Sequence, residues 1–328
     1  MVLRNPFVTV FMVGCLILAG CSSGGQEAEV AFDTEGEVDI IGPLVSDGES
    51  VWWLTENEDE TEALEVTKAD AETGDVEWSK PAGFGTVRPI FLHDNDLWIK
   101  VSRTAWPGEL DEKLLRVDAV TGDVTGEVPI ESYGVAMVDG LLWTVDSVGL
   151  FEVVDPMSLE VVETRQVYGL GSEFDLYGPP EHAVEFEDVV WVTALGHAFS
   201  LDTDTREVVD FIDFPGPGGF DWLQVHDDEL WAGRTYNLGH IRISSLKIDT
   251  ESGTVEEVDL FESPFGSIEH NGYLFDVVGE NKVAQIDIET GETVATFKGL
   301  DPFSFVVTDG YLWANNDEQV VRYETATN

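Results

Sequence analysis

The segment 47–78 reads DGESVWWLTENEDETEALEVTKADAETGDVEW and contains both halves of a pattern that recurs along the chain. A turn dipeptide precedes a short apolar stretch with an aromatic centre, here VWWLT (51–55), and a second turn follows that begins with Asp, here DAETGDV (70–76). Asp-Gly and Asn-Gly dipeptides favour tight hairpins because Gly and Asn tolerate positive φ angles. The segment therefore predicts short strands joined by hairpins.

The aromatic strand occurs seven times, at intervals of 38 to 48 residues, and one aromatic anchor marks each copy: Trp53, Trp98, Trp143, Trp191, Trp231, Phe275 and Trp313. An Asp-headed turn follows the anchors, as in DAVTGDV (118–124) and DIETGET (287–293). Strands of alternating pattern flank that turn, so each copy contains four strands. Four-stranded units with a period of about 40–45 residues are typical of β-propellers. We predict an all-β fold, a seven-bladed β-propeller of four-stranded blades, with six or eight blades as the alternative.

The ring needs a closing strand, because the last copy stops at Asn328 without a fourth strand. The segment GEVDIIG (36–42) resembles GETVATFKG (291–299) and lies just before the first copy. We therefore expect residues 37–41 to complete the seventh blade, which would pair the beginning of the chain with its end. The propeller domain is accordingly expected to cover residues 37–328.

The N-terminal segment has one positive charge, Arg4, and then an apolar run from Phe7 to Leu18. Such a run is too short to span a bilayer and is typical of a secretory signal. It ends in LAGC (18–21), which resembles a bacterial lipobox and implies lipid attachment at Cys21. We expect residues 1–20 to be a lipoprotein signal peptide and residues 21–36 to be the lipidated cysteine with a flexible tether. The protein would then be anchored to the membrane on its extracytoplasmic side; an ordinary signal peptide with a chance cysteine is the alternative.

The chain is strongly acidic, with 65 Asp and Glu, 16 Lys and Arg, and a formal net charge of −49. This balance excludes ordinary nucleic-acid binding, because phosphate contacts need cations. It does not indicate disorder, because 43% of the residues are hydrophobic. The only cysteines are Cys15 and Cys21, so the mature chain has no disulfide. We interpret the acidity as a surface adaptation to high salt, which screens repulsion between like charges.

The segment KADAETGDVEW (68–78) resembles a PQQ-type repeat, and the whole pattern is similar to the quinoprotein-like and YVTN/NHL-like propeller repeats. This resemblance implies the fold over about residues 37–328 and indicates activity only weakly, because propellers have many functions. The other copies lack a counterpart of Trp78. Quinone-binding enzymes of this family usually have eight blades. We expect no cofactor, with a quinone cofactor or calcium as the alternatives, and no metal site.

A binding site is expected where the loops between blades meet the central channel. The residue ten positions before each anchor gives one position per blade, and with two neighbours these form the predicted channel-mouth site: Arg88, Tyr133, Glu181, His182, Asp221, Trp222, Phe265 and Phe303. Charged and aromatic side chains in one layer suit a small polar or peptide ligand. In the alternative interpretation, Phe265 and Phe303 fill space between blades, and Arg88 pairs with a carboxylate.

Three histidines share one position, five residues before an anchor: His93, His226 and His270. A metal constellation is one interpretation. We favour a structural role, because blades two and five lie far apart in a ring and because Ser46 and Thr308 fill the same position. A hydroxyl there would form hydrogen bonds with the turn backbone.

The sequence contains no GxSxG, HExxH, phosphate-loop or CxxC motif, so no catalytic residue is assigned and enzymatic activity is left open. The preferred prediction is a monomeric, lipid-anchored propeller that binds a small ligand, a peptide or an envelope protein. One alternative is a propeller enzyme, either a lyase or hydrolase similar to virginiamycin B lyase or a quinone-dependent oxidoreductase. The second is a structural scaffold of the cell envelope.

Overall fold

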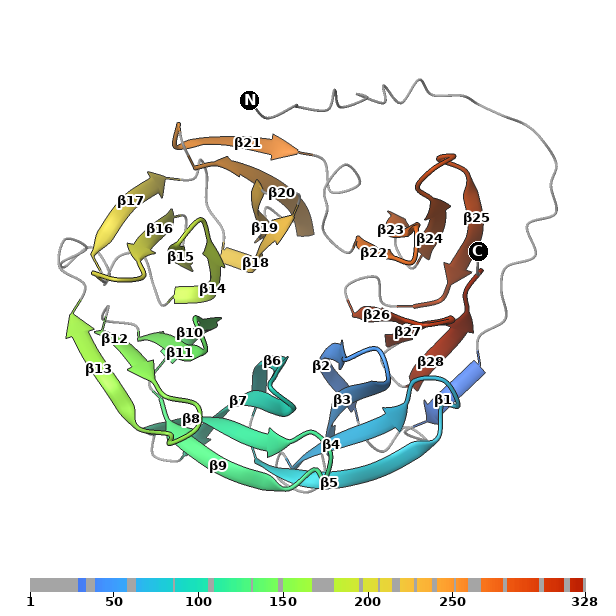
Figure 1. Ribbon diagram of the computed structural model, residues 1–328, viewed down its shortest axis with the longest axis horizontal. Coiled ribbons are helices and arrows are strands. Elements are labelled where there is room, and N and C mark those ends of the chain that lie inside the picture. The colour runs from blue at the N-terminus through green and yellow to red at the C-terminus, as the bar shows by residue number, and fades with distance from the viewer. Residues whose placement is uncertain are drawn as a thin grey trace, which may run out of the picture.

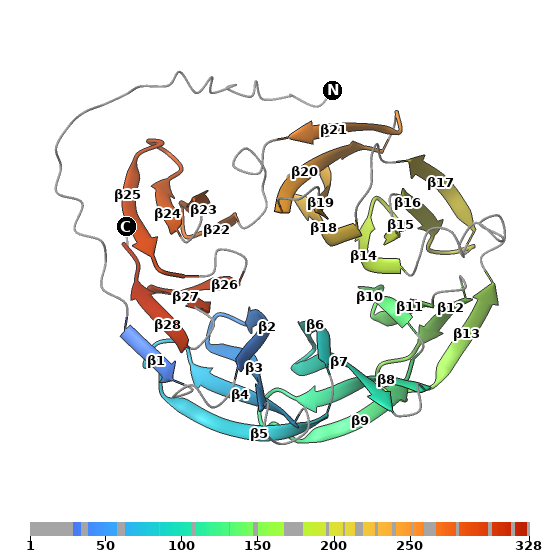
Figure 2. The same cartoon turned by 180° about the vertical axis from the view of Figure 1, so that it is seen from behind.

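The computed structural model contains seven four-stranded antiparallel sheets arranged as blades around a central axis (Figures 1 and 2). This confirms the predicted seven-bladed propeller. The structure describes residues 29–326 except 34–38, 58–62, 85, 106–108, 131, 147–149, 167–179, 195–196, 206, 214–218, 227–228, 238–240, 251, 259–266, 280–281, 301–303 and 316–318. Among these residues no helix is long and apolar enough to cross a membrane.

Six blades each contain four consecutive strands, which follow one another from the centre outward. Blade 1 is β2 (Asp39–Ser46), β3 (Ser50–Asn57), β4 (Ala63–Asp70) and β5 (Val76–Phe84). Blade 2 is β6 (Thr86–His93), β7 (Asp96–Ala105), β8 (Glu109–Asp118) and β9 (Val124–Pro129). Blade 3 is β10 (Ser132–Val138), β11 (Leu141–Asp146), β12 (Leu150–Val154) and β13 (Val161–Gln166). Blade 4 is β14 (Pro180–Phe186), β15 (Val189–Ala194), β16 (His197–Asp202) and β17 (Val208–Asp213). Blade 5 is β18 (Gly219–His226), β19 (Glu229–Asn237), β20 (Ile241–Asp249) and β21 (Thr254–Val258). Blade 6 is β22 (Ile268–His270), β23 (Tyr273–Gly279), β24 (Lys282–Asp287) and β25 (Thr293–Lys298).

Blade 7 joins the two ends of the described chain. Its strands from the centre outward are β26 (Phe305–Thr308), β27 (Tyr311–Asn315), β28 (Gln319–Glu324) and the N-terminal β1 (Glu29–Asp33). An N-terminal strand therefore closes the ring, as predicted, but the prediction that residues 37–41 form it was wrong. Residues from Asp39 onward belong to β2, the innermost strand of blade 1, and the propeller includes residues 29–33, which the sequence placed in the tether.

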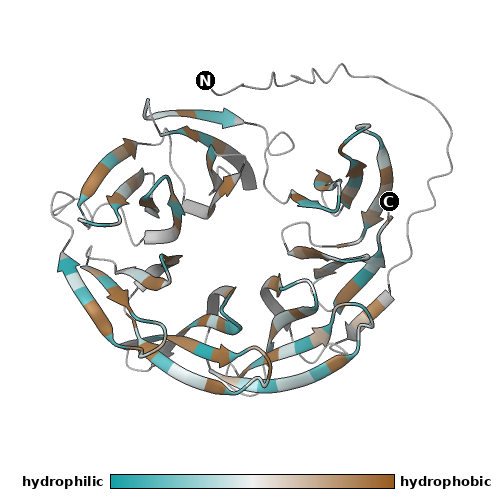
Figure 3. Ribbon diagram, in the orientation of Figure 1, coloured by the Kyte–Doolittle hydropathy of each residue, from teal (hydrophilic) through white to brown (hydrophobic). Residues whose placement is uncertain are grey.

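The hydrophobic core is divided among the spaces between blades. Each of the six described clusters contains residues from two neighbouring blades. Hydrophilic and hydrophobic residues are interspersed along the outer strands (Figure 3). The aromatic anchors lie on the second strand of each blade and are at most 7% exposed. Apart from Trp53, the anchors found in the described clusters pack toward the following blade, as Trp98 does against Leu142 of blade 3.

One predicted anchor, that of blade 1, differs in the structure. Trp52 packs among blade 2 residues and pairs with Lys68 on β4, two positions before Asp70. Trp313 pairs in the same way with Arg322, two positions before Glu324. Trp53 instead faces blade 7, in a cluster with Trp313. The anchor of blade 1 is therefore Trp52, and the prediction of Trp53 was wrong because neighbouring strand residues face opposite sides of a sheet.

The Asp-headed turns between the third and outermost strands share one hydrogen-bond pattern. In blade 2, Asp118 Oδ1 accepts hydrogen bonds from the backbone N–H groups of Val120 (2.9 Å) and Thr121 (2.6 Å). Such donors stabilise the ionised carboxylate. Backbone hydrogen bonds are accordingly the main cause of the lowered pKa of four turn residues: Asp70, Asp118, Asp155 and Asp287.

These lowered pKa values predict part of the response to acid. A carboxyl group whose pKa is lower in the folded state contributes stability above its unfolded pKa of about 3.9, and this contribution is lost as the pH falls through the folded value. Asp118→Asn keeps the acceptor oxygen but cannot titrate. We expect the unfolding free energy of this variant to depend less steeply on pH below about pH 4 than that of the wild type. Urea unfolding between about pH 3 and pH 5 tests this, and parallel curves would contradict it.

The few basic residues include a set that joins blades. Each of these side chains reaches the Asp-headed turn of the following blade. The contacts are Arg322 to the Glu72 carbonyl (2.6 Å), Lys80 to Asp123 (2.6 Å), Arg116 to the Pro156 carbonyl (2.8 Å) and Arg165 to Glu207 (3.6 Å). Basic residues are scarce in this acidic chain, and these four connect one blade to the next.

Trp78 on β5 makes a further contact of this kind. Its indole N–H donates to the Val120 carbonyl of blade 2 at 3.0 Å, and its ring lies beside Gly122, which has a φ of +75°. A Cβ added at Gly122 would lie 2.8 Å from Trp78. Gly291 occupies the same position in blade 6, with a φ of +70°, and a Cβ there would meet nothing within 4 Å.

This pair gives a matched prediction. Gly291→Ala meets only the unfavourable φ, which costs about 1–2 kcal/mol. Gly122→Ala meets the same φ and also displaces the Trp78 ring, so we expect a total loss of about 3 kcal/mol. Chemical denaturation at constant salt compares the two variants. Equal losses would show that the Trp78 contact contributes nothing.

Candidate functional site at the channel mouth

The two faces of the ring differ in their connections. One of them, the hairpin face, has the turns between the first and second strands and the Asp-headed turns. The antiparallel order places the links between blades on the opposite face, the mouth face. Six predicted site residues lie on innermost strands of four successive blades: Arg88 on β6, Tyr133 on β10, Glu181 and His182 on β14, and Asp221 and Trp222 on β18. Phe265 and Phe303 lie outside the described residues.

The backbone register adds a feature that the sequence did not reveal. In blades 2 to 5 the innermost strand leaves its pairing register at the predicted position. The irregularities fall between Val87 and Ile90, Ser132 and Gly134, Pro180 and His182, and Phe220 and Trp222. Arg88, Tyr133, Glu181 and Asp221 are therefore the residues that lie at these β-bulges.

Blade 1 follows the same rule. Its innermost strand loses register between Ile41 and Val45, a stretch that includes Gly42, ten residues before the corrected anchor Trp52. Proline lacks the N–H that a strand ladder needs, so it is confined to edges and bulges. Pro43 and Pro89 lie in two of these irregular stretches, and they were the available sequence signal for the bulges.

A bulge leaves one residue out of the ladder and redirects the chain, which is why bulges occur beside binding sites. Here the irregular stretches leave residues out of the ladder near the mouth end of the innermost strands, three in blade 1, two in blade 2 and one in each of blades 3 to 5. In blades 2 to 5 they include an Arg, a Tyr, a Glu and an Asp. These residue types include hydrogen-bond donors and acceptors and both signs of charge, which a site for a polar ligand needs.

The described carboxyl groups with raised pKa values do not form an acid–base pair with one another. Burial is the main cause of the raised pKa in Asp96, Glu185 and Asp276. These residues belong to blades 2, 4 and 6. Asp276 accepts a hydrogen bond from the Ser267 hydroxyl at 2.8 Å, beside the mouth end of β22.

The position directly before the turn between the first and second strands, which the histidines share with Ser46 and Thr308, has a structural role in the described residues. Ser46 Oγ donates to the Ser50 carbonyl (2.8 Å) and accepts from the Gly48 N–H (3.0 Å), and Thr308 Oγ1 donates to the Tyr311 carbonyl (3.4 Å). This confirms the prediction for both hydroxyl residues. His93 contacts Asp94 (3.4 Å) and His270 contacts Asp309 (2.9 Å). Within the described part of the chain, no group of three or more His, Cys, Asp or Glu side chains is placed to hold a metal ion.

Comparison with known proteins identifies the architecture alone. No protein-family model matches the chain, and no curated protein sequence matches it. Among solved structures, the WD40 domain of Neurospora crassa Pan2 is similar, with a TM-score of 0.59, 11% identity and coverage of 90% of each chain. The computationally designed Ika8 protein has a TM-score of 0.58 and 12% identity, with coverage of 92% of this chain and 100% of Ika8. BamB from Moraxella catarrhalis has a TM-score of 0.49 and 13% identity, with coverage of 87% and 85%.

The seven blades place the chain in the class of β-propellers, and the similarity to a WD40 domain agrees with this. A designed protein and a WD40 domain share the architecture at this level of identity, so the fold by itself does not select a function. Any functional conclusion must come from the residues of this chain.

Proposed function

We propose that this protein is a lipid-anchored, extracytoplasmic propeller that binds a small polar ligand, a peptide or an envelope protein at its channel mouth. The observation that carries the proposal is the series of bulges at one position of five successive blades. Stability alone does not require chemically different residues at a repeated bulge, whereas ligand recognition does. We propose that the blades are of the quinoprotein-like type, and the contact of Trp78 with the next blade supports this. We also propose that the protein is a monomer.

Binding is tested with soluble protein that begins at residue 22. A thermal-shift screen against sugars, short peptides, divalent metals and a quinone cofactor identifies ligands. The variants Arg88→Gln and Asp221→Asn then test the site, with Lys282→Gln and Asp204→Asn as controls on exposed residues elsewhere. We expect the first pair to lose the ligand-induced shift and the controls to keep it. A shift that survives both mouth variants would refute this site.

The lipid anchor at Cys21 lies outside the described residues and is tested separately. In a bacterial host supplied with a labelled fatty acid, we expect the wild type to incorporate label and to fractionate with membranes. Cys21→Ser should lose both properties. Labelling that persists in this variant would contradict the anchor without affecting the proposed binding site.

The net charge of −49 predicts a dependence on salt. Many like charges on one surface destabilise the compact state, and salt screens them over about 10 Å at 0.1 M and about 3 Å at 1 M. We expect the melting temperature to rise steadily from low to molar NaCl. Calorimetry across this range checks it, and a constant melting temperature would rule out adaptation to high salt.

A further inference from the structure

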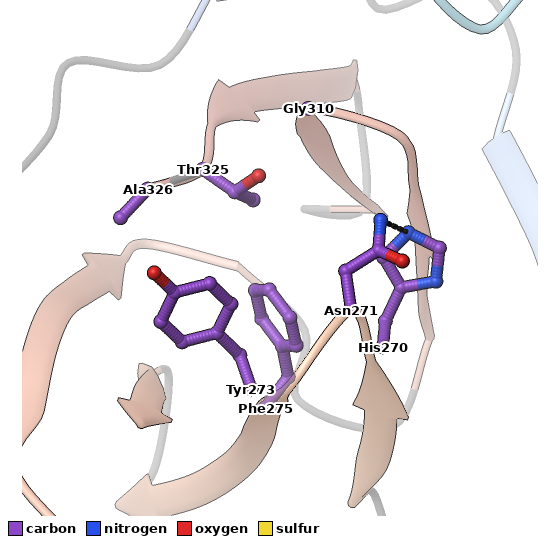
Figure 4. Close-up of a pocket in the computed structure, with 7 residues that line it drawn as sticks. All are labelled: His270, Asn271, Tyr273, Phe275, Gly310, Thr325 and Ala326. Atoms are coloured by element: carbon purple, nitrogen blue, oxygen red, sulfur yellow. Dashed lines mark hydrogen bonds between the residues drawn. The ribbon is translucent and has the colours of Figure 1, made fainter. Parts of the chain in front are cut away.

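A pocket of about 260 Å³ lies between blades 6 and 7 on the hairpin face, opposite the channel mouth (Figure 4). The residues that line it come from the end of β22, the first turns of the two blades, β23 and the segment that follows β28: His270, Asn271, Tyr273, Phe275, Gly310, Thr325 and Ala326. Tyr273 and Phe275 are 6% and 1% exposed and form an aromatic wall. The pocket therefore combines an apolar interior with a polar rim.

Two of the other interfaces show how a tryptophan anchor can fill the corresponding place, whereas the indole N–H groups of Trp98, Trp191 and Trp231 have no such acceptor in the described part of the chain. The anchor Trp52 donates its indole N–H to the Ala119 carbonyl of blade 2 at 3.3 Å, and Trp313 donates to the Ala71 carbonyl of blade 1 at 3.2 Å. Each acceptor residue directly follows the Asp that begins the turn of the next blade. Each also donates its own N–H to the first turn of its blade, as Ala119 does to the Asn95 carbonyl.

In blade 6 the anchor is Phe275, and the corresponding acceptor in blade 7 is Thr325. Thr325 follows Glu324, and its N–H donates to the Gly310 carbonyl of the first turn at 2.8 Å, which confirms the equivalence. Phenylalanine is smaller than tryptophan and has no N–H. The pocket thus lies at the position where the other two interfaces contain an indole ring with a donor for a backbone carbonyl.

The far wall is held in place, so the space does not close. Gln285 is fully buried, donates to the Ala326 carbonyl at 2.8 Å and accepts from the Ala326 N–H at 2.9 Å. Tyr323 donates its hydroxyl to the Lys298 carbonyl at 2.7 Å. The C-terminal segment is therefore tied to blade 6 on both sides of Thr325, and the wall is preorganised for a ligand.

A carboxylate, Asp309, lies beside the lining residues His270 and Asn271. Asp309 Oδ1 accepts a hydrogen bond from the Asn271 amide (2.8 Å) and contacts His270 Nε2 (2.9 Å). These hydrogen bonds, that of Asn271 first, lower the pKa of Asp309, so its carboxylate is ionised at neutral pH. The side chain of Asp309 is 84% exposed, which leaves it accessible from solvent. A cationic group at the mouth of the pocket would be favoured.

We propose that this pocket binds a small planar aromatic amine. The ring would pack against Tyr273 and Phe275, a ring N–H would donate to the Thr325 carbonyl, and a positively charged substituent would lie near Asp309. A cavity of about 150 Å³ holds benzene, and sites for drug-sized ligands begin at about 300 Å³. A pocket of about 260 Å³ therefore fits a ligand of one or two rings.

The test uses soluble protein with tryptamine, indole and indole-3-acetate as probes, by calorimetry or ligand-observed NMR. We expect tryptamine to bind with a Kd on the order of 0.1–1 mM. Indole should bind more weakly and indole-3-acetate most weakly, because its carboxylate meets Asp309. Absence of tryptamine binding, or preference for the acetate, would overturn the proposal.

Variants of the lining locate the ligand. Phe275→Trp restores the indole of the other interfaces, so we expect unchanged or higher thermal stability and at least about tenfold weaker tryptamine binding. Phe275→Leu removes one aromatic ring of the wall but leaves the space open, so it should weaken tryptamine binding less than Phe275→Trp does. If Phe275→Trp does not fold, Asp309→Asn provides the test. This variant should weaken tryptamine binding several-fold and leave the affinity for indole unchanged. Wild-type tryptamine affinity in Phe275→Trp, or in Asp309→Asn, would refute the site.

Discussion

Removal of residues 22–33 is expected to lower the unfolding free energy by about 4 kcal/mol relative to removal of residues 22–28, a fall of roughly 10 °C in melting temperature. The longer deletion removes β1, which pairs with β28 from Glu29 opposite Arg322 to Asp33 opposite Gln319. It exposes the edge of β28 and uncovers the cluster against which Ala31 packs. A free strand edge also promotes association between molecules. Calorimetry and light scattering of the two truncated proteins measure both effects.

A disulfide between β1 and β28 tests the same ring closure by strengthening the pairing that the deletion removes. Val30 pairs with Val321 across β1 and β28. Directly opposite residues in an antiparallel pair have Cα atoms about 4.5–5.5 Å apart, within the range of a disulfide. No cysteine follows Cys21 in the chain, so Val30→Cys with Val321→Cys gives one defined bond. We expect oxidation to raise the melting temperature; equal stability of both truncated proteins, together with no effect of oxidation, would reject closure by β1.

The second large effect concerns a buried ion pair between β7 and β8 of blade 2. Lys100 Nζ lies 3.7 Å from Glu112 Oε1, and the two side chains are 6% and 4% exposed. Removing one member of such a pair leaves a charge in a medium that solvates it poorly, which costs about 3–5 kcal/mol. We therefore expect Lys100→Met to destabilise the protein by about that amount in urea denaturation.

A double variant separates the effect of an uncompensated charge from the effect of losing the packing of one side chain. Replacing both charges by apolar groups removes the uncompensated charge, so Lys100→Met with Glu112→Leu should recover most of the lost stability. The control is the exposed pair Lys113–Glu127, at 3.1 Å, where Lys113→Met should cost less than about 1 kcal/mol. A double variant as unstable as Lys100→Met alone would show that the loss comes from packing and not from charge.

The repeat was readable from the sequence because its signals are local. Turn dipeptides, the Asp-headed turns and one aromatic residue per copy each depend on neighbours a few positions away. The structure confirms their consequence, seven four-stranded blades with buried anchors. The errors occurred where a choice between adjacent residues depends on strand pairing. Trp52 and Trp53 are equally aromatic, and only the pairing of Trp52 with Lys68 shows which one faces blade 2.

The closing strand was misplaced for a related reason. Residues 29–33 and 37–41 are both short segments with apolar residues, and the similarity of 36–42 to 291–299 favoured the second. A ring can close only where the two ends of the chain meet, and this meeting is a long-range contact between Val30 and Val321. No local pattern in either segment encodes it.

The two candidate sites also differ in whether a local sequence pattern indicated them. Counting back from the anchors located the mouth positions Arg88, Tyr133, Glu181 and Asp221, because each innermost strand has a similar length before its turn. The pocket beside Phe275 was not predicted, because one Phe among six Trp is an ordinary substitution in a sequence.

The sequence by itself determined the number of blades and the positions of their turns, since these follow from a local pattern repeated at a regular interval. Only the tertiary structure decided which strand closes the ring, which tryptophan joins blades 1 and 2, and where the core is incompletely filled. Each of these depends on how residues far apart in the chain pack against one another. At the interface of blades 6 and 7 the anchor is Phe275, a smaller side chain without an N–H, and a pocket lies between it and Thr325.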